Sequence, residues 1–356
     1  MVRVRFAPSP TGSLHLGNAL TAVANRAFAD ERGGALLLRF DDTDPTRTVE
    51  GGEEAILRDL EWLEVAPDES PVRQSERGAL YAAAAERALS GGAATRDDDG
   101  AVRLGHDGAT LLRADGTATY QLASVIDDLE LGITHVIRGS DHRPNLDLQR
   151  QIARAVGDEL PEVIHHGLVL GPDGKKLSKR HGHSSVAELR EGGFPAGAVR
   201  AYLEELDLPE HDVHLDLPRL RRLAIDAIAA MSDADLAEAA SAPLDAVPVL
   251  RGARSLVEAR EYARLLVEAT PTAVLSEARP TLERFAELRA PAPERMSSEE
   301  ARAIVRELKA VGGDLRSLRL ALTGAPTGPE LWAVLAALSR EEALARAARA
   351  SAHELA

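Results

Sequence analysis

The first part of the chain alternates between short apolar runs and apolar residues at helical spacing. The runs at 2–6 and 35–40 are typical of buried strands, and helical spacing follows from Leu16 and from Glu53. This alternation favours a parallel sheet with right-handed crossovers. Ligands of such sheets bind beyond the carboxyl ends of the strands. The segments expected at that edge are 5–9 and 41–44.

The pattern changes twice further along the chain. From 73 to 117 it predicts one helix, at 81–89, and then short segments divided by glycine-containing turns. Strand and helix alternate again from 118 to 185, with an apolar run at 163–170, and helical spacing dominates afterwards. We therefore predict an α/β fold in which a Rossmann-like parallel-sheet domain precedes an all-α C-terminal domain. The first expected helices of the later part are 185–192 and 195–206, and its expected interruptions are 242–243, 270–271 and 290–293.

Composition and charge narrow the class of protein. The 356 residues include no cysteine, which excludes disulfides and thiolate metal sites and fits a reducing cytoplasm. No apolar run reaches the roughly 18 residues of a membrane span, so we expect a soluble, cytoplasmic protein. A formal net charge of -15 argues against nonspecific coating of nucleic acid. Basic residues nevertheless cluster at 175–180 and 219–222.

The loop after the first strand carries candidate phosphate-binding chemistry. Pro8 and Pro10 disfavour both strand and helix, so the chain must turn before a helix begins at His15 or Leu16. That turn directs the imidazole and the free amides of the first helical turn into one crevice, and such amides favour phosphate. Gly17 would let a base or ribose approach the backbone closely. Taken alone, the loop is equally typical of a structural turn.

A basic segment far along the chain is the second candidate element. It reads Lys176-Leu177-Ser178-Lys179-Arg180 and follows a turn at 171–174. Its ammonium groups and hydroxyl suit a triphosphate and its leaving pyrophosphate as charge develops on their oxygens. A basic run is also typical of a solvated face. The chain has no Gly-x-x-x-x-Gly-Lys, and no Gly-x-Gly-x-x-Gly after a strand, which argues against P-loop NTPases and dinucleotide dehydrogenases.

Together the two elements resemble a known family. His15-Leu16-Gly17-Asn18 and the segment 176–180 are similar to the two signatures of class I aminoacyl-tRNA synthetases. The resemblance implies a class I catalytic domain that activates L-glutamate with ATP and Mg²⁺ and transfers it to the terminal adenosine of tRNA(Glu), in a protein that we expect to be monomeric. The segments that resemble the glutamyl branch are 5–12, 38–44, 120–128, 132–142 and, near the end, 315–324.

The resemblance also implies a domain order. We expect 1–72 and 118–185 to be the halves of the catalytic domain, separated by an insertion for the tRNA acceptor end at 73–117. A connector that contacts the tRNA stem is expected at 186–250, and an anticodon-binding helical domain at 251–356. The insertion is shorter than is usual in the family, so we expect little more than a hairpin there. Without cysteines it cannot bind zinc through thiolates, as some relatives do in this insertion.

Matching family positions imply a pocket for glutamate. Arg5 and Arg138 are expected to bind the substrate carboxylates, because a guanidinium pairs with them bidentately; surface ion pairs are the alternative. Asp41 is expected to receive the substrate ammonium, at a position where the family more often has glutamate. The other residues implied for this pocket are Ala7, Ser9, Tyr120, which could equally be a core tyrosine, Ser124, which replaces a common asparagine, and His142.

The resemblance assigns the ATP phosphates to His15 and Lys179, with Lys176 supporting the loop. Asp141 is either a ribose acceptor or a helix N-cap. No general base is needed, because the glutamate carboxylate is ionised at pH 7 and attacks the α-phosphorus in line. The family also implies that tRNA must bind before activation is efficient. The remaining residues implied for ATP are Gly17, Asn18 and Ser178.

Other functions stay open at the level of sequence. A paralogue that glutamylates a modified tRNA nucleoside would lack the helical C-terminal part, and a catalytically silent RNA-binding relative would fit the short insertion. A glutaminyl enzyme would carry a β-rich C-terminus. A metal site is not supported, because neighbouring strand residues point to opposite faces and no His-Glu-x-x-His occurs. The histidines considered are His165, His166, His181 and His183.

Overall fold

The computed structural model describes residues 1–175, 177, 184–269 and 276–352. The chain divides into two compact units. The first contains Met1–Arg190 and Val199–Leu217, and the second contains Glu191–Ala198 and Pro218–Ala356. No helix in the described ranges is long and apolar enough to cross a membrane.

A parallel arrangement of strands forms the centre of the first unit. Strand β2 pairs in parallel with β1 and with β3, and β7 pairs in parallel with β8. Strand β7 lies beside β1, and the amide of Thr134, the residue just before β7, donates to the Arg3 carbonyl over 2.9 Å. The resulting order, β3-β2-β1-β7-β8, is the predicted Rossmann-like topology. The strands span Arg3–Phe6 (β1), Ala35–Phe40 (β2), Val72–Arg73 (β3), His135–Gly139 (β7) and Glu162–His166 (β8).

Helix α1 (Leu16–Glu31) packs on β1, β2 and β7, and it begins where the apolar spacing predicted. Its buried side chains include Leu16, Leu20 and Val23. The Asn25 side-chain amide donates to the Ile137 carbonyl over 3.2 Å and so ties the helix to β7. The other elements of this unit are α2 (Gly52–Trp62), α4 (Tyr120–Glu130), α5 (Leu146–Ala155), α6 (Val186–Glu191), and the parallel pair β9 (Val169–Leu170) and β10 (Val213–His214); α7 (Ala196–Leu206) runs from the second unit into the first.

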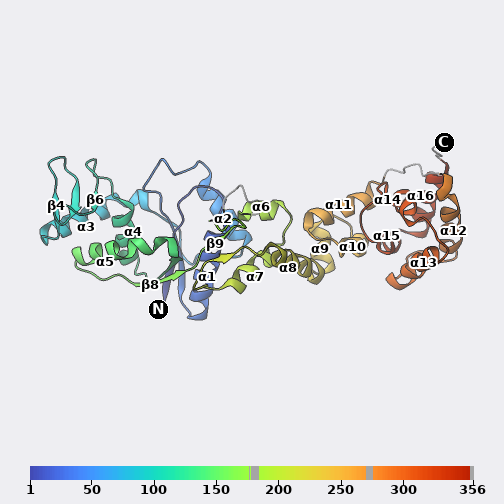
Figure 1. The fold of residues 1–356 in the computed structure, drawn as a ribbon, viewed down its shortest axis with the longest axis horizontal. Coiled ribbons are helices and arrows are strands. Elements are labelled where there is room, and N and C mark those ends of the chain that lie inside the picture. The colour runs from blue at the N-terminus through green and yellow to red at the C-terminus, as the bar shows by residue number, and fades with distance from the viewer. Residues whose placement is uncertain (176, 178–183, 270–275, 353–356) are drawn as a thin grey trace. The chain divides into compact units, whose positions relative to one another are not determined.

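The region between β3 and α4 is more than the expected hairpin. It holds α3 (Gly78–Ser90) and a three-stranded antiparallel sheet, β4-β5-β6. The hairpin prediction is therefore wrong, because a third strand pairs with the second and α3 covers them. Tyr81, Val102, Leu111 and Ile126 belong to the core that joins this region to α4 and α5. Figure 1 shows α3, α4 and α5 in the same part of the fold. The strands span Ala94–Arg96, Val102–Leu104 and Thr110–Leu112.

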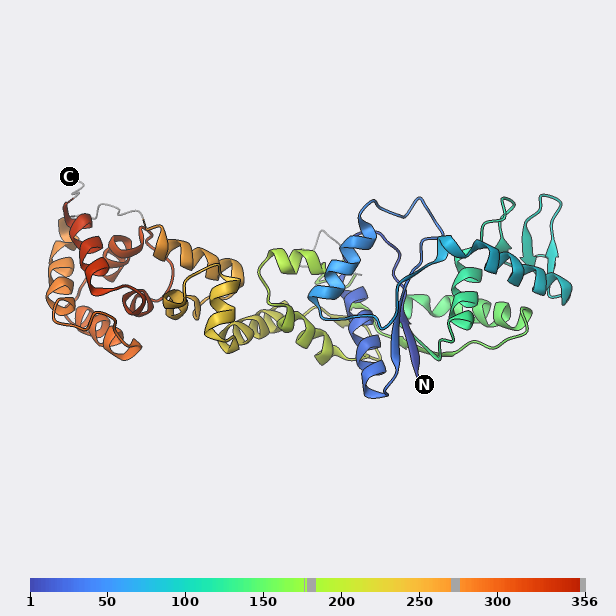
Figure 2. The same cartoon turned by 180° about the vertical axis from the view of Figure 1, so that it is seen from behind.

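The second unit consists of helices over its described residues, as predicted. Phe285, Leu308, Leu322 and Val334 lie at the centre of its largest core. The helices drawn orange to red in Figure 2 gather around that core. The predicted interruption at 270–271 lies outside the described residues. The helices span Leu217–Ala230 (α8), Asp233–Ala239 (α9), Val247–Leu250 (α10), Leu256–Val267 (α11), Arg279–Arg289 (α12), Ser298–Ala310 (α13), Leu315–Thr323 (α14), Leu331–Ala337 (α15) and Arg340–Ala352 (α16).

Candidate active site

A cavity of about 420 Å³ opens at the carboxyl ends of β1 and β7. Its volume falls in the range of small-ligand pockets, and its place is the edge where parallel sheets bind ligands. It is lined by residues of the loop after β1, the first turns of α1, the start of α4 and the ends of β7 and β8. The predicted site residues among them are Arg5, Ala7, Ser9, His15, Gly17, Asn18, Asp41, Tyr120, Arg138, Asp141 and His142.

The N-terminus of α1 faces this cavity. His15 is the N-cap, no side chain caps the helix, and the first helical amide bond runs from Ala19 to the His15 carbonyl over 2.9 Å. Gly17 and Asn18 thus line the cavity with amides that the helix itself leaves without acceptors. Buried His15 Nδ1 has no hydrogen-bond partner among the described residues. A β-carbon on Gly17 would meet no atom within 4 Å, so this backbone borders open space.

The chain on both sides of the basic segment lies beside the His15 loop. Leu177 lines the same cavity. The Leu16 amide donates to the Ser184 carbonyl over 3.0 Å, and the Val186 amide donates to the Leu14 carbonyl over 2.9 Å. The two signatures therefore approach each other at their flanks. The predicted phosphate ligands Lys176, Ser178 and Lys179 themselves lie outside the described residues.

Asp59 of α2 holds this arrangement together. Its Oδ2 accepts from the Ser13 hydroxyl over 2.6 Å and from the Leu14 amide over 2.8 Å, and its Oδ1 accepts from Arg190 over 3.1 Å. The Ser13 hydroxyl also accepts from the amide of Ala187 in α6. Sequence reasoning missed Asp59, although a signal existed. A carboxylate on the apolar face of an amphipathic helix requires buried donors.

A network of charged side chains lies beneath the cavity. Fully buried Arg39 donates to Asp41 Oδ1 over 2.7 Å and to Asp128 Oδ1 over 2.7 Å. Arg5 donates to the same Asp128 oxygen over 2.9 Å. Asp127, behind them, accepts from Arg77 over 2.7 Å. Because buried charges require partners, these contacts explain why acids and arginines recur in the segments 38–44 and 120–128. Neither Arg39 nor the two aspartates were predicted as part of the site.

The pKa values of the two carboxyls that accept from Arg39 are shifted in opposite directions. Burial raises the pKa of Asp41 above its ordinary value, and the charge of Arg39 only partly opposes this. Burial also acts to raise the pKa of Asp128, but Arg5 and Arg39 together outweigh it and leave that pKa below its ordinary value. Asp41 reaches the cavity already paired with Arg39 rather than as an isolated acceptor.

Arg138 has a different environment. Its side chain is buried, and its Nη2 donates to Gln149 Oε1 over 2.8 Å. Its Nε donates to His165 Nε2 over 3.3 Å. It forms no ion pair with any residue that the structure describes. Burial, followed by the charge of Arg5, lowers the pKa of Arg138. The guanidinium thus reaches the cavity without a bound counter-charge.

Three further predictions differ in outcome. Tyr120 lines the cavity, with its hydroxyl 3.5 Å from His142 Nδ1, and is therefore not solely a core residue. Asp141 lies inside the 3₁₀ turn Ser140–Asn145, whose N-cap is Gly139, so the N-cap interpretation is wrong. Ser124 is buried within α4 and is not among the residues that line the cavity.

The sheet order and the uncapped N-terminus of α1 at its carboxyl edge are those of a Rossmann-like α/β domain, which is followed in the chain by a helical unit. Residues 1–106 and 99–214 match the model of the family "tRNA synthetases class I (E and Q), catalytic domain". The chain belongs to this family of class I tRNA synthetases, as its sequence resemblance predicted.

Full-length relatives narrow the likeness to one branch. The chain is 38% identical to glutamate–tRNA ligase 1 of Rubrobacter xylanophilus, over 98% of this chain and 97% of that protein. It is 33% identical to glutamate–tRNA ligase 1 of Gluconacetobacter diazotrophicus, over 97% and 98%. These alignments run over 431 and 465 residues, so both relatives contain segments that this chain of 356 lacks.

A solved structure shares the fold over the whole chain. The crystal structure of a glutamate tRNA ligase from Elizabethkingia meningosepticum in complex with its amino acid has a TM-score of 0.79 and 23% identity. The match covers 98% of this chain and 99% of that one. At this identity the likeness supports the architecture.

Proposed function

We propose that the protein is a glutamate–tRNA ligase that uses ATP, carried with Mg²⁺, to attach L-glutamate to tRNA(Glu), and that it acts as a cytoplasmic monomer. The observation that carries the proposal is one cavity that contains both a helix N-terminus for phosphate and the uncompensated guanidinium of Arg138. Membership of the family and likeness to two full-length glutamate–tRNA ligases support the same reaction.

Arg5 and Arg138 are proposed to hold the glutamate carboxylates. A substrate carboxylate would supply the counter-charge that Arg138 lacks, and bidentate contact would fix its orientation. Asp41 is proposed to accept the substrate ammonium with the lone pairs that remain beside Arg39. Tyr120, His142, Ser9 and the Ala7 backbone border the same space. Ser124 is not proposed as a contact, because it is buried and does not line the cavity.

The phosphates are proposed to lie at the start of α1. His15 and the amides of Gly17 and Asn18 would donate to them, and Lys176, Lys179 and Ser178 are assigned to them by family resemblance. A glutamate carboxylate oxygen attacks the α-phosphorus, an O–P bond forms, and the bond to pyrophosphate breaks. The 2′-hydroxyl of the terminal adenosine of tRNA then attacks the activated carbonyl, loses its proton and expels AMP. Positioning and charge neutralisation provide the acceleration.

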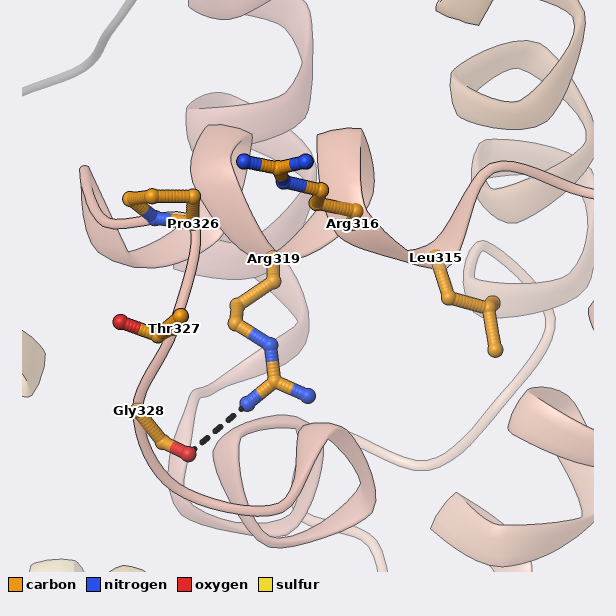
Figure 3. Close-up of a pocket in the computed structure, with 6 residues that line it drawn as sticks. All are labelled: Leu315, Arg316, Arg319, Pro326, Thr327 and Gly328. Atoms are coloured by element: carbon orange, nitrogen blue, oxygen red, sulfur yellow. Dashed lines mark hydrogen bonds between the residues drawn. The ribbon is translucent and has the colours of Figure 1, made fainter.

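The helical unit is proposed to bind the anticodon region. A second cavity, of about 340 Å³, lies at α14. Figure 3 shows Arg316 and Arg319 projecting from that helix, with Arg319 donating to the Gly328 carbonyl over 3.1 Å. The exposed guanidinium of Arg316, beside half-buried Arg319, suits contact with a single-stranded RNA loop. The cavity is lined by Leu315, Arg316, Arg319, Pro326, Thr327 and Gly328.

ATP–pyrophosphate exchange tests the proposed reaction. We expect exchange with glutamate only when tRNA is present, and Lys179→Ala should remove most of it. Arg32→Ala, which removes one cation at the exposed C-terminal end of α1, is the control and should leave the rate unchanged. No exchange with any tRNA at millimolar glutamate would favour the silent relative. Exchange without tRNA would instead favour the nucleoside-modifying paralogue.

A further inference from the structure

Arg138, which is proposed to bind a substrate carboxylate, is held in place by neutral groups. Gln149, on α5, accepts from Arg138 Nη2 over 2.8 Å, and His165, on β8, lies 3.3 Å from Arg138 Nε. Gln149 is almost fully buried, and its amide nitrogen has no hydrogen-bond partner among the described residues. Its visible role is therefore to accept from this guanidinium.

The charges around the cavity show why neutrality matters. Arg39 contacts Asp41 and Asp128, and Arg5 shares Asp128, so the buried carboxylates are committed to these two arginines. Arg77 pairs with the remaining acid of this network, Asp127. Among the described residues, no carboxylate lies within ion-pair distance of Arg138. A carboxylate at position 149 would supply that missing charge from within the protein.

We propose that Gln149 and His165 form a neutral cradle that orients Arg138 while leaving its charge uncompensated, so that the carboxylate of glutamate is selected over the uncharged amide of glutamine. This inference rests on the proposed function. Burial, with the charge of Arg138, lowers the pKa of His165 to about 4, so His165 is neutral at physiological pH and its Nε2 accepts from Arg138. Both residues position Arg138 and neither needs to touch the substrate.

Gln149→Glu tests the cradle, because it changes the charge while keeping the shape and the acceptor. We expect the KM for glutamate in tRNA-dependent ATP–pyrophosphate exchange to rise at least tenfold, while the KM for ATP stays within twofold. Inhibition by glutamine should change little, so discrimination between the two amino acids shrinks. The melting temperature should not fall, because the new carboxylate pairs with Arg138. General damage to the fold would instead lower it and affect both substrates.

Gln151→Glu is the matched control, since it makes the same charge change two residues away on an exposed position of α5. If Gln149→Glu does not fold, His165→Glu provides the second test and should raise the KM for glutamate in the same way, whereas His165→Gln, a neutral acceptor, should stay within threefold of wild type. A KM for glutamate within twofold of wild type in whichever carboxylate variant folds would overturn the cradle. Absence of exchange in the wild-type protein would instead overturn the proposed function, and the cradle with it.

Discussion

Asp59→Ala should loosen the loop that carries His15. The substitution leaves the buried Leu14 amide without its acceptor, and such a donor costs about 1–3 kcal/mol. Loss of the Ser13 hydrogen bond adds about 1 kcal/mol. Arg190 is one-third exposed, so its ion pair adds little. We therefore expect the free energy of unfolding of the first unit to fall by about 2–4 kcal/mol.

Urea unfolding followed by tryptophan fluorescence measures this change. The chain has two tryptophans, Trp62 in the first unit and Trp332 in the second, so a Trp332→Phe background reports on the first unit alone. Asp59→Asn keeps an acceptor for Leu14 but faces Arg190 with an amide, and should lose about 1 kcal/mol. Glu61→Ala, exposed on the same helix, is the control. Equal stability of Asp59→Ala and Glu61→Ala would refute the reasoning.

Three shorter predictions concern the cavity and the network beneath it. Gly17→Leu should fill open space and raise the KM for ATP at least tenfold in the exchange assay without lowering the melting temperature. Arg39→Met should leave Asp41 buried without its partner and Asp128 with Arg5 alone, and should cost about 3–5 kcal/mol in urea unfolding. Burial acts to raise the pKa of Asp128, but its arginine partners hold that pKa below its ordinary value. The ion pairs of Asp128 therefore stabilise the fold above the pKa that Asp128 has in the unfolded chain, and this stabilisation is lost as the pH falls through its pKa in the folded protein. Urea midpoints should therefore drop more steeply on acidification for wild type than for Asp128→Asn.

Local sequence patterns predicted an element well where one apolar run or one apolar helix face specifies it. The strand expected at 35–40 is β2 to the residue, and α1 begins at Leu16 after the two prolines. Buried runs and helical spacing leave little choice there, because the alternatives would expose apolar surface. The apolar run at 163–170 was less decisive. It breaks between β8 and β9, where the Gly167 amide donates to the Pro209 carbonyl instead of extending a strand.

The candidate site was predictable as a set of residues but not as a set of contacts. Resemblance selected Arg5, His15 and Arg138, and all three line one cavity. It did not assign a role to Asp59 or Gln149, because their partners belong to other elements of the fold and only folding brings them together. Of the two interpretations of Asp141, the N-cap was wrong. Whether a residue is an N-cap depends on the backbone of its neighbours, which its side chain does not reveal.

The sequence alone determined the family, the alternation of strands and helices, and the edge of the sheet at which the cavity opens, since periodicity, prolines and glycines act over a few residues. Only the tertiary structure decided which arginine keeps its charge for a ligand. Arg5 and Arg39 share an aspartate that is 123 and 89 residues away in the chain, whereas Arg138 contacts neutral acceptors. Electrostatic interaction depends on distance and burial, and the separation of two residues in the sequence specifies neither.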